Sequence, residues 1–185
     1  MKNNIYLVGF MGTGKTTIGK ELAKKLGRHF IDTDDLIEKR NNMSILEIYE
    51  KMGEKYFLQE EKKVAQELSV QSGKVVSTGG GTILNDEVIE LMLKSGIIIC
   101  LYVENEFILN RLKKLDRRPV LRTENTLEER VNELLSEREE VYKKISIKLN
   151  TTNLTPMQAA DRIVDLLKTR QKILTKLNDF FIDLK

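Results

Sequence analysis

The sequence contains very few reactive side chains: among its 185 residues are one cysteine, one histidine, two prolines and no tryptophan. A single cysteine excludes a disulfide framework and any metal site built from several cysteines, and a single histidine excludes a zinc site with two histidine ligands. His29 is therefore the one imidazole that could act as an acid or base near neutral pH. We predict a partly packed, non-catalytic His29, because it lies on the buried part of a strand and precedes the acidic residues at that strand's end.

Long apolar runs and a strong net charge are absent as well. No run approaches the roughly 18 apolar residues of a membrane helix, and the first residues, MKNNIYLVGF, lack the pattern of a secretory signal peptide. A formal net charge of +3 is too small to indicate a nucleic-acid or membrane-surface partner. We therefore expect a cytoplasmic, single-domain protein in which Cys100 is reduced, with neither nucleic acid nor membrane as a partner.

Short apolar segments alternate with amphipathic segments along the chain. Strands are predicted at residues 5–9, 29–32, 74–77, 97–102 and 145–149. Helices are predicted at about residues 15–26, 44–52, 55–72, 86–94, 106–112 and 126–142, and from residue 155 onwards. This alternation favours an α/β domain with helices on both faces of a parallel sheet. Ligands of such folds bind at the carboxyl ends of the strands, so the residues that follow the strands are the first candidates for a site.

The first predicted strand runs into a glycine-rich segment. Residues 9–16 read GFMGTGKT, which fits the pattern G-x-x-x-x-G-K-[ST] between a strand and a helix. Glycines allow backbone N–H groups to converge on phosphate oxygens, and the helix N-terminus adds the positive end of its dipole. Lys15 is expected to bind the β- and γ-phosphates, and Thr16 to offer its hydroxyl to Mg²⁺. The predicted ATP-binding residues of this segment are Gly12, Thr13, Gly14, Lys15, Thr16 and Thr17.

The class of phosphate-loop protein can be narrowed further. The sequence contains no N-K-x-D motif, with which GTPases read their base, and motor and switch ATPases usually have longer chains. A small P-loop kinase is the class that remains.

Candidate acceptor-binding residues follow the second and third strands. Asp32 and Asp34 lie two residues apart, so that one can hold the Mg²⁺ shell while the other meets an acceptor hydroxyl. A lone aspartate in this place is often a helix cap, and we assign that role to Asp35. After the third strand, residues 78–82 read TGGGT, and three consecutive glycines bring backbone N–H groups close to a small ligand.

A polar segment, residues 113–125, precedes the helix that starts near Thr126. It contains five basic residues and few apolar anchors, so we expect a mobile lid that becomes ordered over ATP and substrate. Such a lid excludes water and neutralises charge on the transferred group. Arg138, with Tyr142 four residues later, lies on the following helix and could point back toward the site.

Taken together, these motifs resemble the shikimate kinase family over about residues 3–168. The matching segments are GFMGTGKT (9–16), FIDTDDLIE (30–38), GEKYFLQEE (53–61), TGGG (78–81), RPVL (118–121) and Arg138 with Tyr142. The resemblance implies a P-loop kinase fold of the nucleoside-monophosphate-kinase type, with a five-stranded parallel sheet of order 2-3-1-4-5 and a mobile lid. It also implies transfer of the ATP γ-phosphoryl group to the 3-hydroxyl of shikimate, in aromatic amino-acid biosynthesis. We expect a monomer that uses Mg²⁺.

The resemblance assigns roles to individual residues. Lys15 binds the phosphates, Thr16 and, through water, Asp32 hold Mg²⁺, and Asp34 meets the acceptor hydroxyl as a candidate base. Arg118 on the lid reaches between phosphate and substrate, and Arg138 binds the carboxylate. The backbone of Gly79, Gly80 and Gly81 holds the substrate, and Arg111 and the Thr155–Pro156 turn lie near the adenine.

The chain departs from the family pattern at Leu58, where the family has an arginine that contacts the shikimate carboxylate. Losing one of the two arginines that hold the carboxylate costs about 2–4 kcal/mol of binding free energy if nothing compensates. Lys55 and Lys62 could share the face of Leu58, although neither reproduces a planar guanidinium. Three interpretations remain: a shikimate kinase with a rearranged clamp, a kinase of a less anionic polyol or cyclitol, and a protein that binds nucleotide or a partner without turnover.

The predicted organisation is a kinase domain followed by a tail. The kinase domain spans residues 1–168, with the lid at about 113–125 and the substrate-binding helices at about 34–61. Residues 169–185 are predicted to form a helical extension that packs on the domain surface, with a partner contact as the alternative.

Overall fold

Five parallel strands form one sheet in the part of the chain that the computed structural model describes, residues 3–113 and 126–182, with side chains described up to residue 173. The strands are β1 (Asn4–Val8), β2 (His29–Asp32), β3 (Lys74–Ser77), β4 (Gly96–Tyr102) and β5 (Lys148–Asn150). They lie in the order β2-β3-β1-β4-β5, and each neighbouring pair is parallel. The predicted sheet and its order 2-3-1-4-5 are thereby confirmed.

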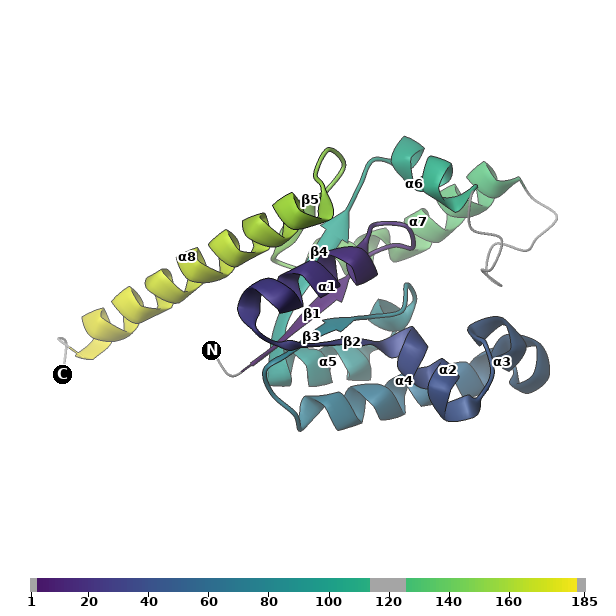
Figure 1. The fold of residues 1–185 in the computed structure, drawn as a ribbon, viewed down its shortest axis with the longest axis horizontal. Coiled ribbons are helices and arrows are strands. Elements are labelled where there is room, and N and C mark those ends of the chain that lie inside the picture. Colours follow the sequence, from purple (N-terminus) through teal and green to yellow (C-terminus); the bar gives the residue numbers. More distant parts are fainter. Residues whose placement is uncertain (1–2, 114–125, 183–185) are drawn as a thin grey trace.

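Helices cover both faces of this sheet (Figure 1). They are α1 (Lys15–Leu26), α2 (Thr33–Asn41), α3 (Ile45–Met52), α4 (Glu54–Ser69), α5 (Asp86–Ser95), α6 (Asn105–Leu112), α7 (Leu127–Lys144) and α8 (Pro156–Ile182), with a 3₁₀ turn, η1 (Thr82–Leu84). Helices α1 and α8 lie together on one side, and α4 and α5 on the other. The carboxyl ends of the strands are left open between these layers and α7.

The side chains of β1 alternate between two hydrophobic cores, as a central strand requires. Ile5 and Leu7 pack with residues of α1 and α8, whereas Tyr6 and Val8 pack with residues of α4 and α5. All four side chains are buried. The sheet is therefore held from both sides, and this rigid centre positions the loops that follow its strands.

Local sequence signals set several helix ends as predicted. Ser44 and Thr126 each begin a helix with a capping box, in which the side-chain hydroxyl accepts from the backbone N–H of a glutamate three residues on and that glutamate accepts in return. Gly27 ends α1 in the left-handed conformation, with a φ of 61°.

The segment between β2 and α3 corrects one prediction. Residues Thr33–Asn41 form α2, and its cap is Asp32, whose side chain accepts a hydrogen bond from the backbone N–H of Asp34. The assignment of Asp35 as the cap was wrong, because the helix begins three residues earlier than that assignment requires. Asp35 lies in the first turn of α2, where a carboxylate favours the positive end of the helix dipole.

Other boundaries differ from the predicted ones. Strand β5 is Lys148–Asn150 rather than residues 145–149, since Ile145 caps the end of α7 and is buried in the core. Helix α4 ends at Ser69 rather than at residue 72. His29 is exposed at the start of β2, so the prediction that it lies on the buried part of a strand was wrong.

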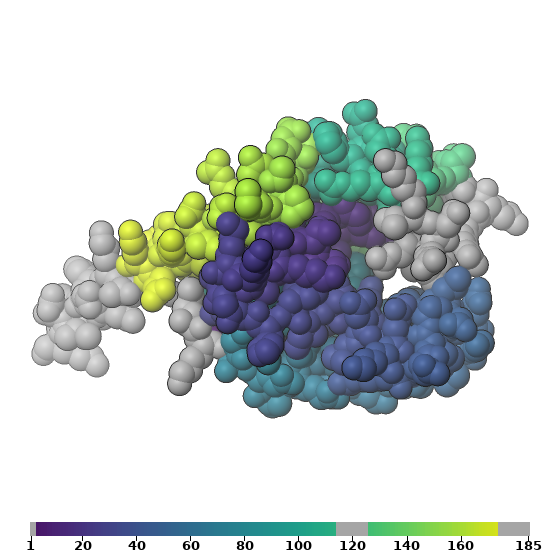
Figure 2. Space-filling view, viewed as in Figure 1, coloured from purple at the N-terminus to yellow at the C-terminus, as the bar shows by residue number. Residues whose placement is uncertain are grey.

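The last helix is continuous across residue 168 and ends at Ile182. The yellow part of this helix, up to residue 173, projects past α1 in the space-filling view (Figure 2), and the Ile173 side chain is exposed. The separate extension of residues 169–185 and its packing stay a prediction. None of the helices within the described residues is long and apolar enough to cross a membrane.

Candidate active site

The glycine-rich segment forms a tight loop between β1 and α1. Gly9 has a φ of 142°, and a Cβ atom there would lie 2.2 Å from the carbonyl oxygen of Leu101, so only glycine fits. Gly14 caps α1 in the left-handed conformation, and the first turn of α1 contains no acidic residue. The loop and the start of α1 therefore line a cavity of about 520 Å³ with backbone N–H groups and the positive end of a helix dipole.

Lys15 is buried inside this loop. Its Nζ atom donates hydrogen bonds to the carbonyl oxygens of Gly9, at 2.9 Å, and Phe10, at 3.0 Å. These bonds hold the ammonium group at the wall of the cavity, which the side chain lines together with Thr16 and Thr17. A cation in this place neutralises phosphate charge without needing to be recruited from solvent.

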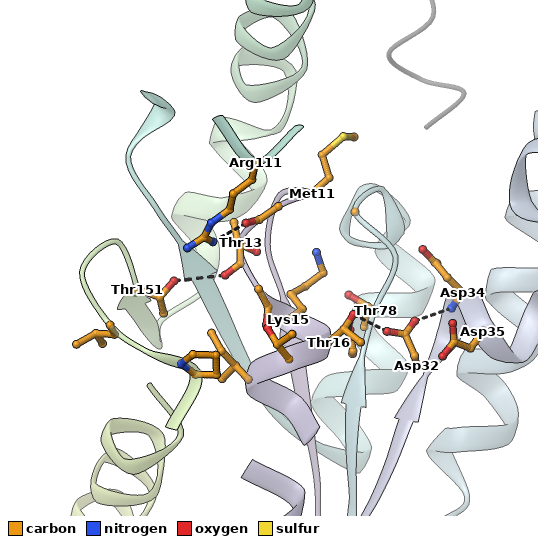
Figure 3. Close-up of a pocket in the computed structure, with 18 residues that line it drawn as sticks. Met11, Thr13, Lys15, Thr16, Asp32, Asp34, Asp35, Thr78, Arg111 and Thr151 are labelled. Carbon is orange, nitrogen blue, oxygen red and sulfur yellow. Dashed lines mark hydrogen bonds between the residues drawn. The ribbon is translucent and has the colours of Figure 1, made fainter. Parts of the chain in front are cut away.

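Thr16 and Asp32 supply the oxygen atoms that a divalent cation prefers. The Thr16 hydroxyl donates to Asp32 Oδ2 at 2.7 Å, and Asp32 Oδ1 accepts from the backbone N–H of Asp34 at 3.1 Å (Figure 3). One hydroxyl and one carboxylate beside a phosphate cradle match the way in which Mg²⁺ is bound, with substrate phosphates and water completing its shell. Among the described residues, no group of three or more acidic, cysteine or histidine side chains is arranged to hold a metal ion.

The far end of this cavity carries the predicted adenine neighbours. Arg111 donates to the carbonyl oxygen of Gly12 at 2.7 Å, and Thr151 donates to that of Thr13 at 3.4 Å. Pro156 and Leu154 line the same end. The structure thus brings α6, the β5–α8 connection and the phosphate loop together, as Figure 3 shows for the labelled residues.

A second cavity, of about 660 Å³, adjoins the first. The two cavities share Met11, Asp34 and Gly80 in their walls. Residues of α3, α4 and α7 and the three glycines after β3 form the rest of the second wall. Asp34 therefore lies where a group bound at the phosphate loop would meet a molecule bound in the second cavity.

A pair of carboxyl groups surrounds Gly79. A Cβ atom at Gly79 would lie 2.7 Å from Glu61 Oε1 and 2.8 Å from Asp34 Oδ1, so a larger residue there would have to displace these two carboxyl groups. Gly81 shows no such restriction, since a Cβ there would meet no atom within 4 Å. Of Gly79 and Gly81, Gly79 is thus the position at which an added side chain would disturb the two carboxyl groups.

Glu61 is a buried member of this site for which the sequence analysis gave no role. Its carboxyl accepts a hydrogen bond from the Thr82 hydroxyl. Burial raises the pKa of Glu61 to about 7, and the charge of Asp34 acts in the same direction, against the Thr82 hydrogen bond and the charge of Arg138. Its place at the end of the matching segment 53–61 was the signal that could have identified it.

Arg138 enters the second cavity from α7, as predicted. The residue is only 5% exposed, and its Nη1 atom donates to the carbonyl oxygen of Gly80 at 2.9 Å. Its guanidinium lies 5.4 Å from the centre of the Phe10 ring, within the range of a cation–π interaction. A buried arginine held in this manner is prepared to bind an anion. Tyr142, the residue paired with it in the motif, packs in the core instead of lining this cavity.

Leu58 lies in the wall of the second cavity and is 38% exposed. The alignment of this helix onto the acceptor site therefore agrees with the structure. Lys55 and Lys62 are not among the residues that line the cavity, and Lys62 forms an ion pair with Glu87. Neither lysine replaces the missing arginine.

Three predicted features stand apart from this assembly. Arg118 and the lid, except Lys113, lie outside the described residues. His29 lines neither cavity. Cys100 is buried in the core, and burial raises its pKa to about 11, so its thiol is neutral.

Comparison with known proteins decides between the classes of P-loop protein. A protein-family model described as shikimate kinase matches residues 11–168. The chain belongs to the shikimate kinase family. This confirms the resemblance seen in the motifs and makes the protein an ATP-dependent kinase.

Individual members of the shikimate kinase family align with nearly the whole chain. The shikimate kinase of Thermodesulfovibrio yellowstonii is 44% identical over 161 residues, which cover 87% of this chain and 92% of that protein. That of Sulfurihydrogenibium sp. is 42% identical over 167 residues, which cover 90% and 99%.

Solved shikimate kinases share the fold. The enzyme from Acinetobacter baumannii, in complex with shikimate, is 36% identical, has a TM-score of 0.87 and aligns over 92% of this chain and 95% of its own. The enzyme from Aquifex aeolicus is 35% identical, with a TM-score of 0.79 and coverage of 91% and 98%.

Proposed function

We propose that this member of the shikimate kinase family transfers the γ-phosphoryl group of ATP to the 3-hydroxyl of shikimate. The observation that carries the proposal is the junction of two cavities at Asp34, one formed by a phosphate loop and the other containing a buried arginine. The relative from Acinetobacter baumannii, which is 36% identical to this chain, was solved in complex with shikimate.

ATP occupies the first cavity in this proposal. The backbone N–H groups of the loop and the Lys15 ammonium bind the phosphates, which positions the γ-phosphorus and disperses its charge. Thr17 lies beside the phosphates, and Arg111 and Pro156 flank the adenine. Mg²⁺, held by the Thr16 hydroxyl and, through water, by Asp32, supplies further charge neutralisation.

Shikimate occupies the second cavity. Asp34 accepts a hydrogen bond from the 3-hydroxyl and takes its proton as the oxygen attacks phosphorus. The backbone of Gly79, Gly80 and Gly81 follows the ring, and Arg138 binds the carboxylate. Arg118 on the lid covers the transferred group from residues 113–125, and helices within 34–61 close the acceptor side.

The cellular setting is proposed from the same grounds. The enzyme acts as a cytoplasmic monomer in aromatic amino-acid biosynthesis, with a kinase domain of residues 1–168 and an extension of residues 169–185. Small molecules are its partners, in agreement with a modest net charge of +3.

A panel of acceptors tests the proposal. ATP consumption is measured with shikimate, with neutral cyclitols and polyols, and without acceptor, alongside Lys15→Met as the inactive control. We expect turnover with shikimate. Turnover with a neutral acceptor alone would favour the interpretation that Leu58 marks a less anionic substrate, and ATP binding without turnover on any acceptor would favour a binding protein.

A further inference from the structure

One face of α7 forms a wall of the acceptor cavity. Four of its residues line that cavity, and they occur at helical spacing: Arg130, Leu134, Glu137 and Arg138. At 1.5 Å per residue the two arginines lie about 12 Å apart along the helix axis, with Leu134 between them. A ligand in the cavity can therefore be approached by guanidinium groups from both ends of this face.

The charges of the cavity wall are unbalanced for an anionic acceptor. Its described lining contains the carboxyl groups of Asp34, Glu54, Glu61, Asp86 and Glu137. The cations in the same lining are Arg130 and Arg138. A carboxylate transferred from water into such a place is strongly disfavoured unless cations pair with it.

Arg138 supplies a single guanidinium to a wall that contains five carboxyl groups. One of its nitrogen atoms is already engaged with the carbonyl oxygen of Gly80, and the plane of the group is held near Phe10. Leu58, across the cavity on α4, contributes an apolar side chain. A second cation has to come from another part of the wall.

Arg130 takes part in an ion pair that adds little stability. Its Nη1 atom forms an ion pair with Glu133 at 3.0 Å, and the two side chains are 23% and 46% exposed. Partly exposed pairs three residues apart on a helix contribute little stability, because water competes for both charges. A desolvated acceptor carboxylate would be a stronger partner than Glu133.

We infer that Arg130 is a specificity-determining residue, which pairs with the acceptor carboxylate together with Arg138. It supplies the second cation, which Leu58 cannot provide. This inference rests on the proposed function, since it presumes an acceptor that carries a carboxylate. Arg130 does not touch the reacting atoms in this scheme, so its loss affects acceptor binding more than the chemical step.

Steady-state kinetics of the full chain test this role. In Arg130→Leu we expect the KM for shikimate to rise about 10- to 100-fold, the loss of one charged hydrogen-bonded contact. The KM for ATP should remain within about twofold of wild type, because the lost contact binds the acceptor and not the nucleotide. With shikimate methyl ester, which lacks the negative charge, wild type and Arg130→Leu should show similar KM values.

A matched variant separates recognition from a structural role of the ion pair. Glu133→Gln removes the same ion pair and leaves Arg130 in place, so the KM for shikimate should be unchanged or lower. An increase equal to that of Arg130→Leu would overturn the inference. Arg130→Lys keeps the charge and the helix propensity, so its KM for shikimate should lie between those of wild type and Arg130→Leu. This variant replaces Arg130→Leu in the test if Arg130→Leu does not fold.

Rescue from the opposite wall gives the sharpest result. In the Arg130→Leu background, Leu58→Arg should restore the KM for shikimate, because both side chains line the one cavity. An unchanged KM for shikimate in Arg130→Leu, with wild type active on shikimate, would contradict the inference about Arg130 and leave the proposed function intact. Absence of shikimate turnover in wild type, with turnover of a neutral acceptor, would instead reject the proposed function.

Discussion

The nucleotide cavity and the acceptor cavity share a border but are built in different ways. The phosphate end of the first is made from one contiguous loop and the helix that it opens, residues 11–18, and its chief binding groups are backbone N–H groups and Lys15. The second is made from side chains on α2, α3, α4 and α7 and from the glycines after β3. The first cavity depends on a local conformation, whereas the second depends on the packing of distant segments.

This difference separates phosphate binding, which depends on one loop conformation, from acceptor recognition, which can be changed by substitutions in the cavity wall. A phosphate group needs converging N–H groups, which only a particular loop conformation provides. An acceptor carboxylate needs cations, which several positions on the cavity wall can provide equally well. Substitutions in the loop should therefore abolish the reaction, and substitutions in the acceptor wall should change substrate preference.

The largest effect is expected at Lys15. Lys15→Met keeps the length of the side chain but removes the charge that meets the phosphates, so kcat should fall by at least about 1,000-fold. Circular dichroism and thermal unfolding would verify that the variant is folded. A kcat near that of wild type in a folded variant would show that the loop does not position this cation for transfer.

Two aspartate variants distinguish the roles of Asp34 and Asp32 at the border between the cavities. Asp34→Asn should lower kcat by about 100- to 10,000-fold with little change in nucleotide affinity, because the acceptor hydroxyl loses its carboxylate partner. Asp32→Asn should instead raise the Mg²⁺ concentration needed for half-maximal activity. Exchanged phenotypes would mean that the roles within the pair are reversed.

Glu61, on the acceptor side, should make the stability of the protein depend on pH. Its pKa is about 7 in the folded protein, against an ordinary value of 4.5. The folded state therefore binds more protons than the unfolded state between these values, so the free energy of unfolding falls as pH rises from about 4.5 to 7. The loss is about 3 kcal/mol and is complete above the folded pKa.

Urea unfolding at pH 5 and pH 8 measures this effect. Glu61→Gln should match wild type at pH 5 and exceed it in stability at pH 8, since the amide oxygen still accepts from Thr82. Glu90→Gln, on the exposed surface of α5, is the control. Equal pH dependence in wild type and Glu61→Gln would show that this carboxyl is not kept protonated by its surroundings.

The smallest effect is expected at Leu58. In wild type, Leu58→Arg should lower the KM for shikimate by about tenfold, the value of one added charge-assisted contact. If the acceptor is neutral, the same change introduces an uncompensated guanidinium and lowers activity with that acceptor. A titration of shikimate against both proteins distinguishes the outcomes by sign, and an unchanged KM would place residue 58 away from the substrate.

Local sequence patterns predicted much of the fold and the nucleotide-binding part of the site. Alternating apolar segments predicted the parallel sheet, and the capping boxes at Ser44 and Thr126 located two helix starts. The start of helix α2 was misplaced, because its few apolar residues give no clear helical period and its cap, Asp32, was interpreted only as a functional residue. The start of β5 differed because Ile145 caps the end of α7, where its backbone N–H donates to the carbonyl oxygen of Tyr142.

The sequence by itself determined the phosphate loop, since every group that matters there lies within a few residues and its geometry follows from glycine and helix termini. It also indicated the pair Asp32 and Asp34. Only the tertiary structure decided that Glu61 lies beside Asp34 and that Arg130 and Leu58 share a cavity. These residues are far apart in the chain, and their proximity depends on how α4 and α7 pack against the sheet, which no local pattern specifies.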